Sequence, residues 1–286
     1  MTATALMLVV AAAVLHAGWN ALAKRGRDPI AFLWLASWVA AAALAPWGAR
    51  ELLVAGLPWH AVPFVAGTIV LHVLYFYALG RAYATGAYSV VYPIARGLGV
   101  ALVPIVAWML LGERLSRLGV LGIALVIGGV VVLHRLGGQP GAISRAAIGS
   151  ASVWAVVTGL TIASYSIVDK VGVTRLHPVP YMLLMEAGCV VALAPLIGGR
   201  RGAARAEWAA NRWTIVATGI MSAGAYTLVL FAFQLSKAGY VVASRELSIV
   251  LSALIGSVLL REGRLPPRLA GAGIVLAGVA CVALAR

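Results

Sequence analysis

Ten apolar segments, each about as long as a helix needs to cross a bilayer, follow one another along this chain. A helix crosses the hydrocarbon core with roughly 20 apolar residues. Segments of about that length lie at residues 3–23, 29–49, 62–81, 87–111, 117–134, 148–168, 179–199, 213–235, 240–260 and 267–285. They predict an all-α integral membrane protein with ten transmembrane helices.

The composition excludes an ordinary soluble domain. Of the 286 residues, 63% are apolar and 10% are charged, against about 25% charged in soluble domains. The 22 Lys and Arg residues outnumber the 8 acids, but they lie in short gaps between the apolar segments. That placement is typical of topology determinants and lipid contacts, so no nucleic acid is expected as a partner. Cys189 and Cys281 lie inside apolar segments without a second ligand nearby, so neither a disulfide nor a metal site is expected.

The second half of the chain repeats the first with an offset of 149 residues. Pro29 corresponds to Pro178, Arg96 to Arg245 and Gly122 to Gly271, whereas the offset is 146 around Trp19 and Tyr165. The predicted organisation is a first repeat at residues 1–136, a loop at 137–147 and a second repeat at 148–286. Because each repeat has five helices, an odd number, the second repeat enters the membrane from the side opposite to that of the first. The fold expected is therefore two inverted five-helix repeats.

Two stretches resemble a known family. They are His16-Ala-Gly-Trp-Asn-Ala-Leu-Ala-Lys24 and Leu110-Leu-Gly-Glu-Arg-Leu115, the latter followed by a glycine-rich helix. Both look like the EamA family of the drug/metabolite transporter superfamily, and the resemblance covers the whole chain. It implies a bacterial inner (cytoplasmic) membrane protein that exports amino acids or related metabolites. It also implies a cytoplasmic N-terminus, whereas the positive-inside rule would place both termini outside. Both orientations stay open.

Glu186 is the sharpest candidate for a functional charge. A charged group inside hydrocarbon costs from about 3 to 10 kcal/mol or more, and Glu186 lies roughly 12 Å into the seventh segment. Its repeat partner is Ser37. Glu186 is predicted either to couple ions or bind a substrate ammonium, or else to form an interhelical hydrogen bond.

The equivalent arginines Arg96 and Arg245 belong to polar stripes on the fourth and ninth segments. The stripes also hold Tyr88 and Tyr92 beside Arg96, and Ser248 and Ser252 beside Arg245. Such stripes usually face a cavity, so they are predicted to line a pathway. Each Arg precedes a helix-closing Glu by about 25 Å, so inversion is expected to place the two at opposite ends of the pathway. Snorkelling to the interface is the alternative.

A further polar set is predicted to line the same cavity. It comprises His16, Trp19 and Asn20 of the first segment, their counterparts Tyr165 and Ser166, and His72 and Tyr75 of the third, which could meet them. A lone buried His is more often a structural hydrogen-bonding residue than a proton carrier. Aromatic residues in such a cavity would suit an apolar side chain or ring. By contrast, Glu113 is expected to form an interfacial ion pair with Arg114. The glycine-rich fifth and tenth segments are expected to serve as scaffold or dimer contact.

These features predict a secondary transporter whose repeats alternate access to a central site. The expected partners are a small-molecule substrate and the lipid bilayer. A monomer holds both repeats and is sufficient for a pathway, while a dimer and proton coupling stay open. No Walker motif is present, so ATP is not expected to drive the cycle, and no cofactor is expected. The alternatives are a phosphorylated-sugar or nucleotide-sugar exchanger, in which the arginines bind phosphate, and an intramembrane lipid-modifying enzyme. An enzyme fits less well because the acids are scattered, and of these only Glu186 and Glu246 look buried.

Overall fold

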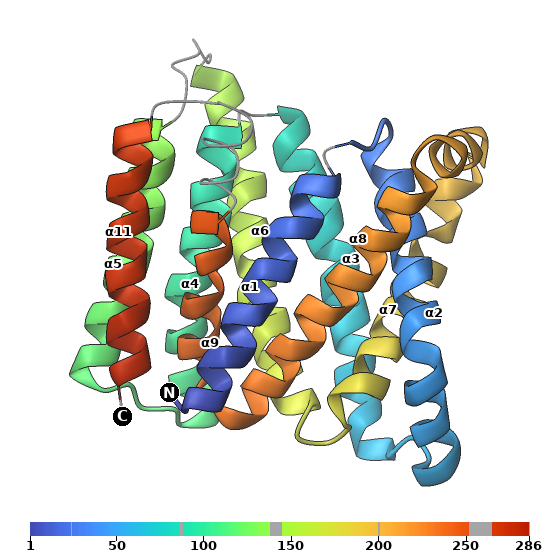
Figure 1. Cartoon of the computed structure of the whole chain (residues 1–286), viewed down its shortest axis with the longest axis horizontal. Coiled ribbons are helices and arrows are strands. Elements are labelled where there is room, and N and C mark those ends of the chain that lie inside the picture. The colour runs from blue at the N-terminus through green and yellow to red at the C-terminus, as the bar shows by residue number, and fades with distance from the viewer. Residues whose placement is uncertain (24, 86–87, 138–144, 200, 252–264, 286) are drawn as a thin grey trace.

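The chain folds as a layered assembly of long helices (Figure 1). The computed structural model describes residues 1–23, 25–85, 88–137, 145–199, 201–251 and 265–285. The helices are α1 (Ala3–Ala23), α2 (Pro29–Ala55), the 3₁₀ helix η1 (Trp59–Ala61), α3 (Val62–Thr85), α4 (Tyr88–Leu111), α5 (Arg117–Gly137), α6 (Arg145–Gly172), α7 (Pro178–Gly198), α8 (Arg201–Leu235), α9 (Ala238–Arg245) and α11 (Leu265–Leu284). No strand occurs in these ranges, and six stretches are long and apolar enough to cross a membrane. The prediction of an all-α membrane protein is confirmed, and ten α-helices lie in the described ranges.

Local capping explains where α2 begins and ends. Asp28 is its N-cap, and the Asp28 carboxylate accepts hydrogen bonds from the N–H groups of Ile30 and Ala31 at 3.1 Å. Pro29 follows at the first helical position, where its missing N–H costs nothing. Gly56 ends the helix with a φ of 73°, a conformation that favours glycine. α2 therefore continues past its predicted end at residue 49.

Residues 201–212, which lie between the seventh and eighth predicted segments, are helical. They form the first turns of α8, which bends at Asn211, where φ is −128°. The buried Glu207 anchors this segment: it accepts hydrogen bonds from the backbone N–H groups of Arg27 and Asp28 and from the Asn211 amide. The α1–α2 loop is thereby fixed to α8.

The ninth predicted segment is interrupted at Glu246. α9 ends at Arg245, and the N–H of Glu246 bonds to the carbonyl of Ala243, three residues back. Such 3₁₀-type turns within a helical stretch frequently mark functional positions. α9 also lies in the middle of the molecule, in contact with α1, α4, α5, α6, α8 and α11. The interruption therefore lies at the centre of the helix assembly, at the charged residues Arg245 and Glu246.

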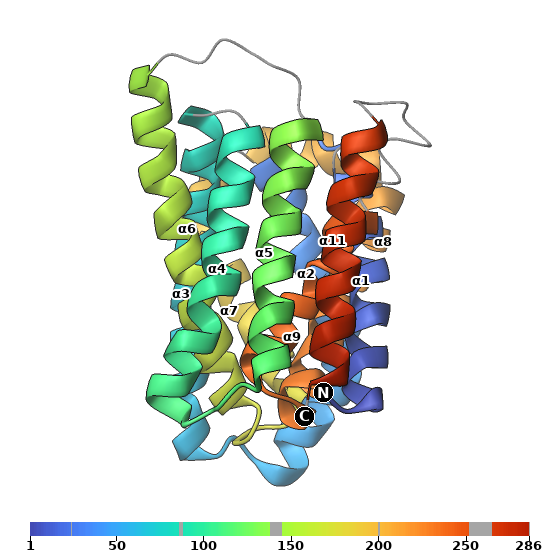
Figure 2. The ribbon, with the colours of Figure 1, turned by 90° about the vertical axis from the view of Figure 1, so that its left-hand side faces the viewer.

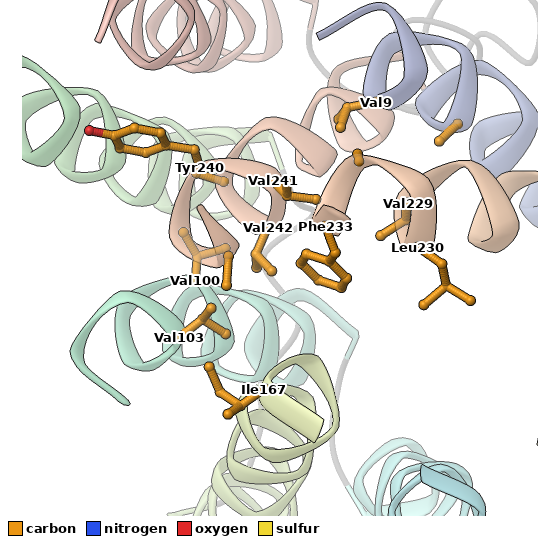
Figure 3. Close-up of a cluster of buried hydrophobic side chains, with 14 of the residues drawn as sticks. Val9, Val100, Val103, Ile167, Val229, Leu230, Phe233, Tyr240, Val241 and Val242 are labelled. Atoms are coloured by element: carbon orange, nitrogen blue, oxygen red, sulfur yellow. The ribbon is translucent and has the colours of Figure 1, made fainter. Parts of the chain in front are cut away.

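Valine and phenylalanine side chains pack around α9 (Figure 3). Val242 of α9 lies among Val100 and Val103 of α4, Ile167 of α6 and Phe233 of α8, and all five belong to one buried cluster. Both chain termini lie at the same end of the molecule (Figure 1), where the amino group of Met1 donates to the carbonyl of Ala285 at 2.6 Å. The charged side chains described below belong to helices that this apolar core holds together.

α5 and α11 pack against each other along one edge of the molecule (Figure 2). A Cβ atom at Gly122 would lie 2.7 Å from the carbonyl oxygen of Gly278, and one at Gly129 would lie 2.9 Å from that of Gly271. Gly122 precedes Gly129 in α5, whereas its partner Gly278 follows Gly271 in α11, so the two helices run antiparallel. This is the close packing that small residues permit, and it agrees with the scaffold role predicted for these two helices.

Candidate functional site

A buried ion pair joins α4 to the end of α9. The Nη2 atom of Arg96 lies 2.5 Å from Oε1 of Glu246, and its Nε donates to Oε2 at 3.3 Å. The two side chains are 9% and 2% exposed. Arg96 therefore does not snorkel to the interface, and Glu246 pairs with a base of another helix. Each charge is compensated by the other, as a buried pair requires.

Arg245 lies beside this pair but has different surroundings. Its guanidinium carbon is 5.2 Å from the centre of the Tyr226 ring, a cation–π contact. The side chain is partly exposed, and within the described residues it forms no ion pair or hydrogen bond. A guanidinium whose N–H donors are free can bind a carboxylate or phosphate through two parallel hydrogen bonds, in bidentate geometry.

The prediction that Arg96 and Arg245 lie at opposite ends of the pathway is wrong. Glu246 contacts Arg96 and follows Arg245 directly, so both cations lie at one level. The reason is geometric. Arg96 is roughly 12 Å from the start of α4, close to the middle of a 30 Å core.

Four rings from α3, α6 and α8 form an aromatic cluster next to Arg245. His72 stacks on Tyr165 with ring centres 4.3 Å apart, and its edge meets Tyr226 at 5.5 Å. Tyr75 meets Tyr165 edge-on at 5.8 Å. His72 and Tyr75 were expected to meet the polar residues of the first and sixth predicted segments, and this is confirmed for Tyr165 of the sixth. Stacked and edge-on rings of this kind form a surface that suits an apolar or aromatic ligand group.

Asp169 is a buried carboxylate that the sequence interpretation missed. It is fully buried on α6, where it accepts hydrogen bonds from the hydroxyl of Tyr181 at 2.8 Å and from that of Tyr226. The expectation that only Glu186 and Glu246 are buried acids is wrong, because Asp169 and Glu207 are buried as well. One signal was available: Asp169 follows Tyr165 by four residues and so shares its helix face.

The α1 residues form a local set of contacts. The indole N–H of Trp19 donates to Nδ1 of His16 at 3.2 Å, and the Asn20 amide donates to the carbonyl of His16 at 2.7 Å. All three side chains keep partial exposure. These hydrogen bonds lie within α1 itself.

The predicted serines differ from one another. The Ser166 hydroxyl donates to the carbonyl of Ile162 at 2.7 Å, a bond within its own helix. Ser248 is 1% exposed, and its hydroxyl has no hydrogen-bond partner among the described residues. Tyr88, Tyr92 and Ser252 lie outside the residues whose side chains the structure describes.

Glu186 lies between α7 and α2 and is 8% exposed. Its repeat partner Ser37 lies on α2, close enough to influence the carboxyl group. Nearby, the Trp34 indole donates to the carbonyl of Val190, which joins the same two helices. Both interpretations of Glu186, an interhelical contact and a functional acid, stay predictions.

Glu113 pairs with Lys170 and not with the neighbouring Arg114 as predicted. Its Oε1 lies 3.7 Å from Nζ of Lys170, and its Oε2 accepts the N–H of Ala238 at 2.7 Å. Lys170 also donates to the carbonyl of Ser236 at 2.7 Å. A carboxylate at the first N–H groups of a helix is favourable, so Glu113 fixes the start of α9 and connects the two halves of the chain.

Comparisons with known proteins agree with the resemblance found in the sequence. The model of the EamA-like transporter family matches residues 3–135 and 149–284. The chain is 35% identical over 103 residues to the multidrug transporter PA4990 of Pseudomonas aeruginosa, covering 36% of this chain and 90% of that protein. It is 35% identical over 71 residues to the quaternary ammonium compound-resistance protein QacE of Escherichia coli, covering 25% of this chain and 64% of QacE.

A solved crystal structure shares the fold. It matches with a TM-score of 0.73 and 21% identity over 99% of both chains. The family model matches nearly all of both halves, in a chain whose helices are apolar enough to span a membrane. The chain therefore belongs to the EamA-like transporter family, and it is a multi-pass membrane protein.

Proposed function

We propose that this protein is a secondary transporter that exports amino acids or related small metabolites by alternating access through a central cavity. The observation that carries the proposal is the contrast at the centre of the molecule. Arg96 is neutralised by Glu246, whereas Arg245 has no hydrogen-bond or ion-pair partner among the described residues and lies beside an aromatic cluster. A free interior cation is costly unless it serves a ligand. The family supports transport without covalent chemistry, so no enzymatic reaction is proposed.

The helix contacts support two inverted repeats as the architecture behind this cycle. The repeat pairs α1 with α6, α3 with α8 and α4 with α9. Accordingly, the contact of α1 with α8 has its counterpart in the contact of α6 with α3. The contact of α4 with α6 likewise has its counterpart in the contact of α9 with α1. α2 packs on its own counterpart α7, and α5 packs on α11. A two-fold relation between the halves would generate these contacts.

The glycine contacts of α5 and α11 support the inversion. With the 149-residue offset, Gly122 corresponds to Gly271 and Gly129 to Gly278. Exchanging the halves therefore converts the contact of Gly122 with Gly278 into the contact of Gly271 with Gly129, which is the other contact observed. Counterpart helices that cross antiparallel are expected when the two-fold axis lies in the membrane plane.

The substrate class follows from the groups around Arg245. Its guanidinium suits a carboxylate, and the aromatic cluster of His72, Tyr165 and Tyr226 suits a side chain. The substrate ammonium would lie towards Asp169, which also accepts the Tyr226 hydroxyl, since Glu246 is engaged by Arg96. A zwitterion therefore meets a complementary charge at each end. The exposed parts of His16, Trp19, Asn20, Tyr75 and Arg245 favour a solvent-filled cavity between them.

A phosphorylated substrate fits these groups less well. It would need more than one uncompensated cation for its two negative charges, and Arg96 is already engaged by Glu246. An organic cation is the second candidate. The aromatic rings next to the buried Asp169 favour it, as do the names of the relatives, a quaternary ammonium compound-resistance protein and a multidrug transporter.

The test is uptake into proteoliposomes that contain the purified protein, with and without a pH gradient. The compounds would be radiolabelled aromatic, aliphatic and hydroxylated amino acids, one sugar phosphate and one quaternary ammonium compound. Arg245→Gln should raise the KM for amino-acid uptake roughly 10–150-fold. The matched control is Arg212→Gln, because Arg212 also lies over an aromatic ring, that of Trp213 at 5.6 Å, but is exposed.

The two candidates predict opposite results for the variants. For a zwitterion, Arg245→Gln raises the KM for uptake. For an organic cation, Arg245→Gln preserves or increases uptake, whereas Asp169→Asn lowers it. Absence of saturable uptake for every amino acid would refute the leading proposal. Stimulation by the pH gradient would add proton coupling, and a bacterial inner membrane is the location we propose.

A further inference from the structure

A groove opens on the outside of the molecule between α4 and α5, which lie side by side in Figure 2. Its volume is about 540 Å³, within the roughly 300–1,000 Å³ of small-molecule sites. Ile105 and Trp108 of α4 and Val120 of α5 line it, and they are 51%, 59% and 54% exposed. In a bilayer these side chains face lipid, so the groove is filled by acyl chains.

One end of the groove is basic. Arg114, which lines it, and Arg117, the first residue of α5, are both exposed. Lys237 adds a third positive charge, since its ammonium donates to the carbonyl of Arg114 at 2.6 Å. Glu113 also lines this end, but its two carboxylate oxygens are already engaged by Lys170 and by the N–H of Ala238. The loop between α4 and α5 therefore presents an excess of positive charge beside an apolar groove.

We propose that this groove is a binding site for an anionic phospholipid of the surrounding bilayer. One acyl chain lies along Ile105, Trp108 and Val120, and the phosphate binds Arg114 and Arg117. Arginine side chains bind phosphate oxygens in pairs, and basic pockets at the ends of transmembrane helices select anionic headgroups. A zwitterionic lipid brings its own ammonium next to three protein cations, so it occupies the groove less favourably. The site lies outside the proposed transport pathway and does not depend on it.

Trp108 makes the site measurable by fluorescence. The full-length protein is reconstituted in phosphatidylcholine with increasing mole fractions of dibrominated phosphatidylglycerol or dibrominated phosphatidylcholine, whose bromine atoms quench nearby indoles. The difference between the wild-type protein and Trp108→Phe isolates Trp108 among the nine tryptophans. We expect half-quenching of Trp108 at a roughly 25-fold lower mole fraction of the anionic lipid, or about fivefold per arginine.

Substitutions at the loop test the phosphate contact. Arg114→Gln should reduce the preference for the anionic lipid about fivefold, and Arg114→Gln with Arg117→Gln should remove it. Arg50→Gln is the matched control, because Arg50 is an exposed arginine near the end of α2 and does not line the groove; it should keep the preference. Equal quenching of the wild-type protein by the two brominated lipids would overturn the proposal. So would an Arg50→Gln variant that loses the preference as fully as the double variant, because the effect would then be one of diffuse surface charge.

Discussion

Arg96 and Arg245 occupy equivalent positions in the two halves of the chain, yet only one of them is neutralised. Arg96 is buried and held by both oxygens of Glu246, whereas Arg245 is partly exposed and contacts the ring of Tyr226. The difference arises at a single neighbouring position, because the counterpart of Glu246 in the first half is Gly97. Both halves carry the cation, but only the second half carries the acid. One arginine therefore stabilises the helix arrangement, while the other is available to a ligand.

The largest expected effect comes from removing the acid of the buried pair. Glu246→Gln leaves the charge of Arg96 buried without its partner, which should destabilise the protein by about 3–5 kcal/mol. Arg245→Gln removes a partly exposed cation and should change stability by less than about 1 kcal/mol. Thermal unfolding of both variants in the same detergent measures the contrast. Equal losses for the two would mean that the arginines do not differ in role.

A second variant separates charge from packing at the same place. Arg96→Met combined with Glu246→Leu replaces the pair by apolar side chains, and such replacements are often neutral or stabilising. If the double variant is as unstable as Glu246→Gln, then the shape of the pair and not its charge holds α4 to α9.

The next effect concerns Arg245 and ligand binding. A hydrogen bond to a charged group contributes about 1.5–3 kcal/mol, so Arg245→Gln should weaken substrate binding roughly 10–150-fold while the protein stays folded. The measurement is the KM for uptake in proteoliposomes. Arg245→Lys should rescue binding in part, because lysine keeps the positive charge but lacks the planar guanidinium with its paired N–H donors. An unchanged KM would mean that the free guanidinium does not contact the substrate.

The α5–α11 pair offers the opposite case, in which equivalent residues should behave alike. A methyl group at Gly129 or at its counterpart Gly278 would meet the backbone of the other helix at 2.7 and 2.6 Å, so each alanine variant should lose about 1–3 kcal/mol. Gly128→Ala is the control, because nothing lies within 4 Å of the added atom. Unfolding midpoints should fall equally for Gly129→Ala and Gly278→Ala. Unequal losses would argue against a symmetric contact.

Apolar length and small-residue spacing were sufficient to predict the helices, since both are local properties of the sequence. The boundaries missed were those set by distant contacts, as at α8, where Glu207 is anchored by the α1–α2 loop. The same distinction applies to the site. Arg96, Arg245, His72 and Tyr165 stood out as polar residues in apolar segments.

Asp169 was missed because its hydrogen-bond partners come from far along the chain. Tyr181 and Tyr226 lie 12 and 57 residues away, and no spacing rule connects residues so distant. The depth of the two arginines in the membrane was mispredicted for a similar reason. Depth was counted from a helix-closing glutamate, but Glu113 lies beyond the end of α4 and contacts α9.

The smallest effect concerns Ser37 and Glu186, repeat partners that contact each other across α2 and α7. If this contact is only an interhelical hydrogen bond, Ser37→Ala should cost about 0.6 kcal/mol, the average for such bonds in a membrane protein. Glu186→Gln, which keeps a group that can bond to Ser37, should then cost no more, and uptake should respond to the pH gradient as in the wild-type protein. A Glu186→Gln variant that folds normally but has lost its response to the gradient would contradict this. In that case Glu186 would couple transport to ions, and the second half of the chain would carry an acid of separate function at each of two positions, Glu186 and Glu246, where the first half has Ser37 and Gly97.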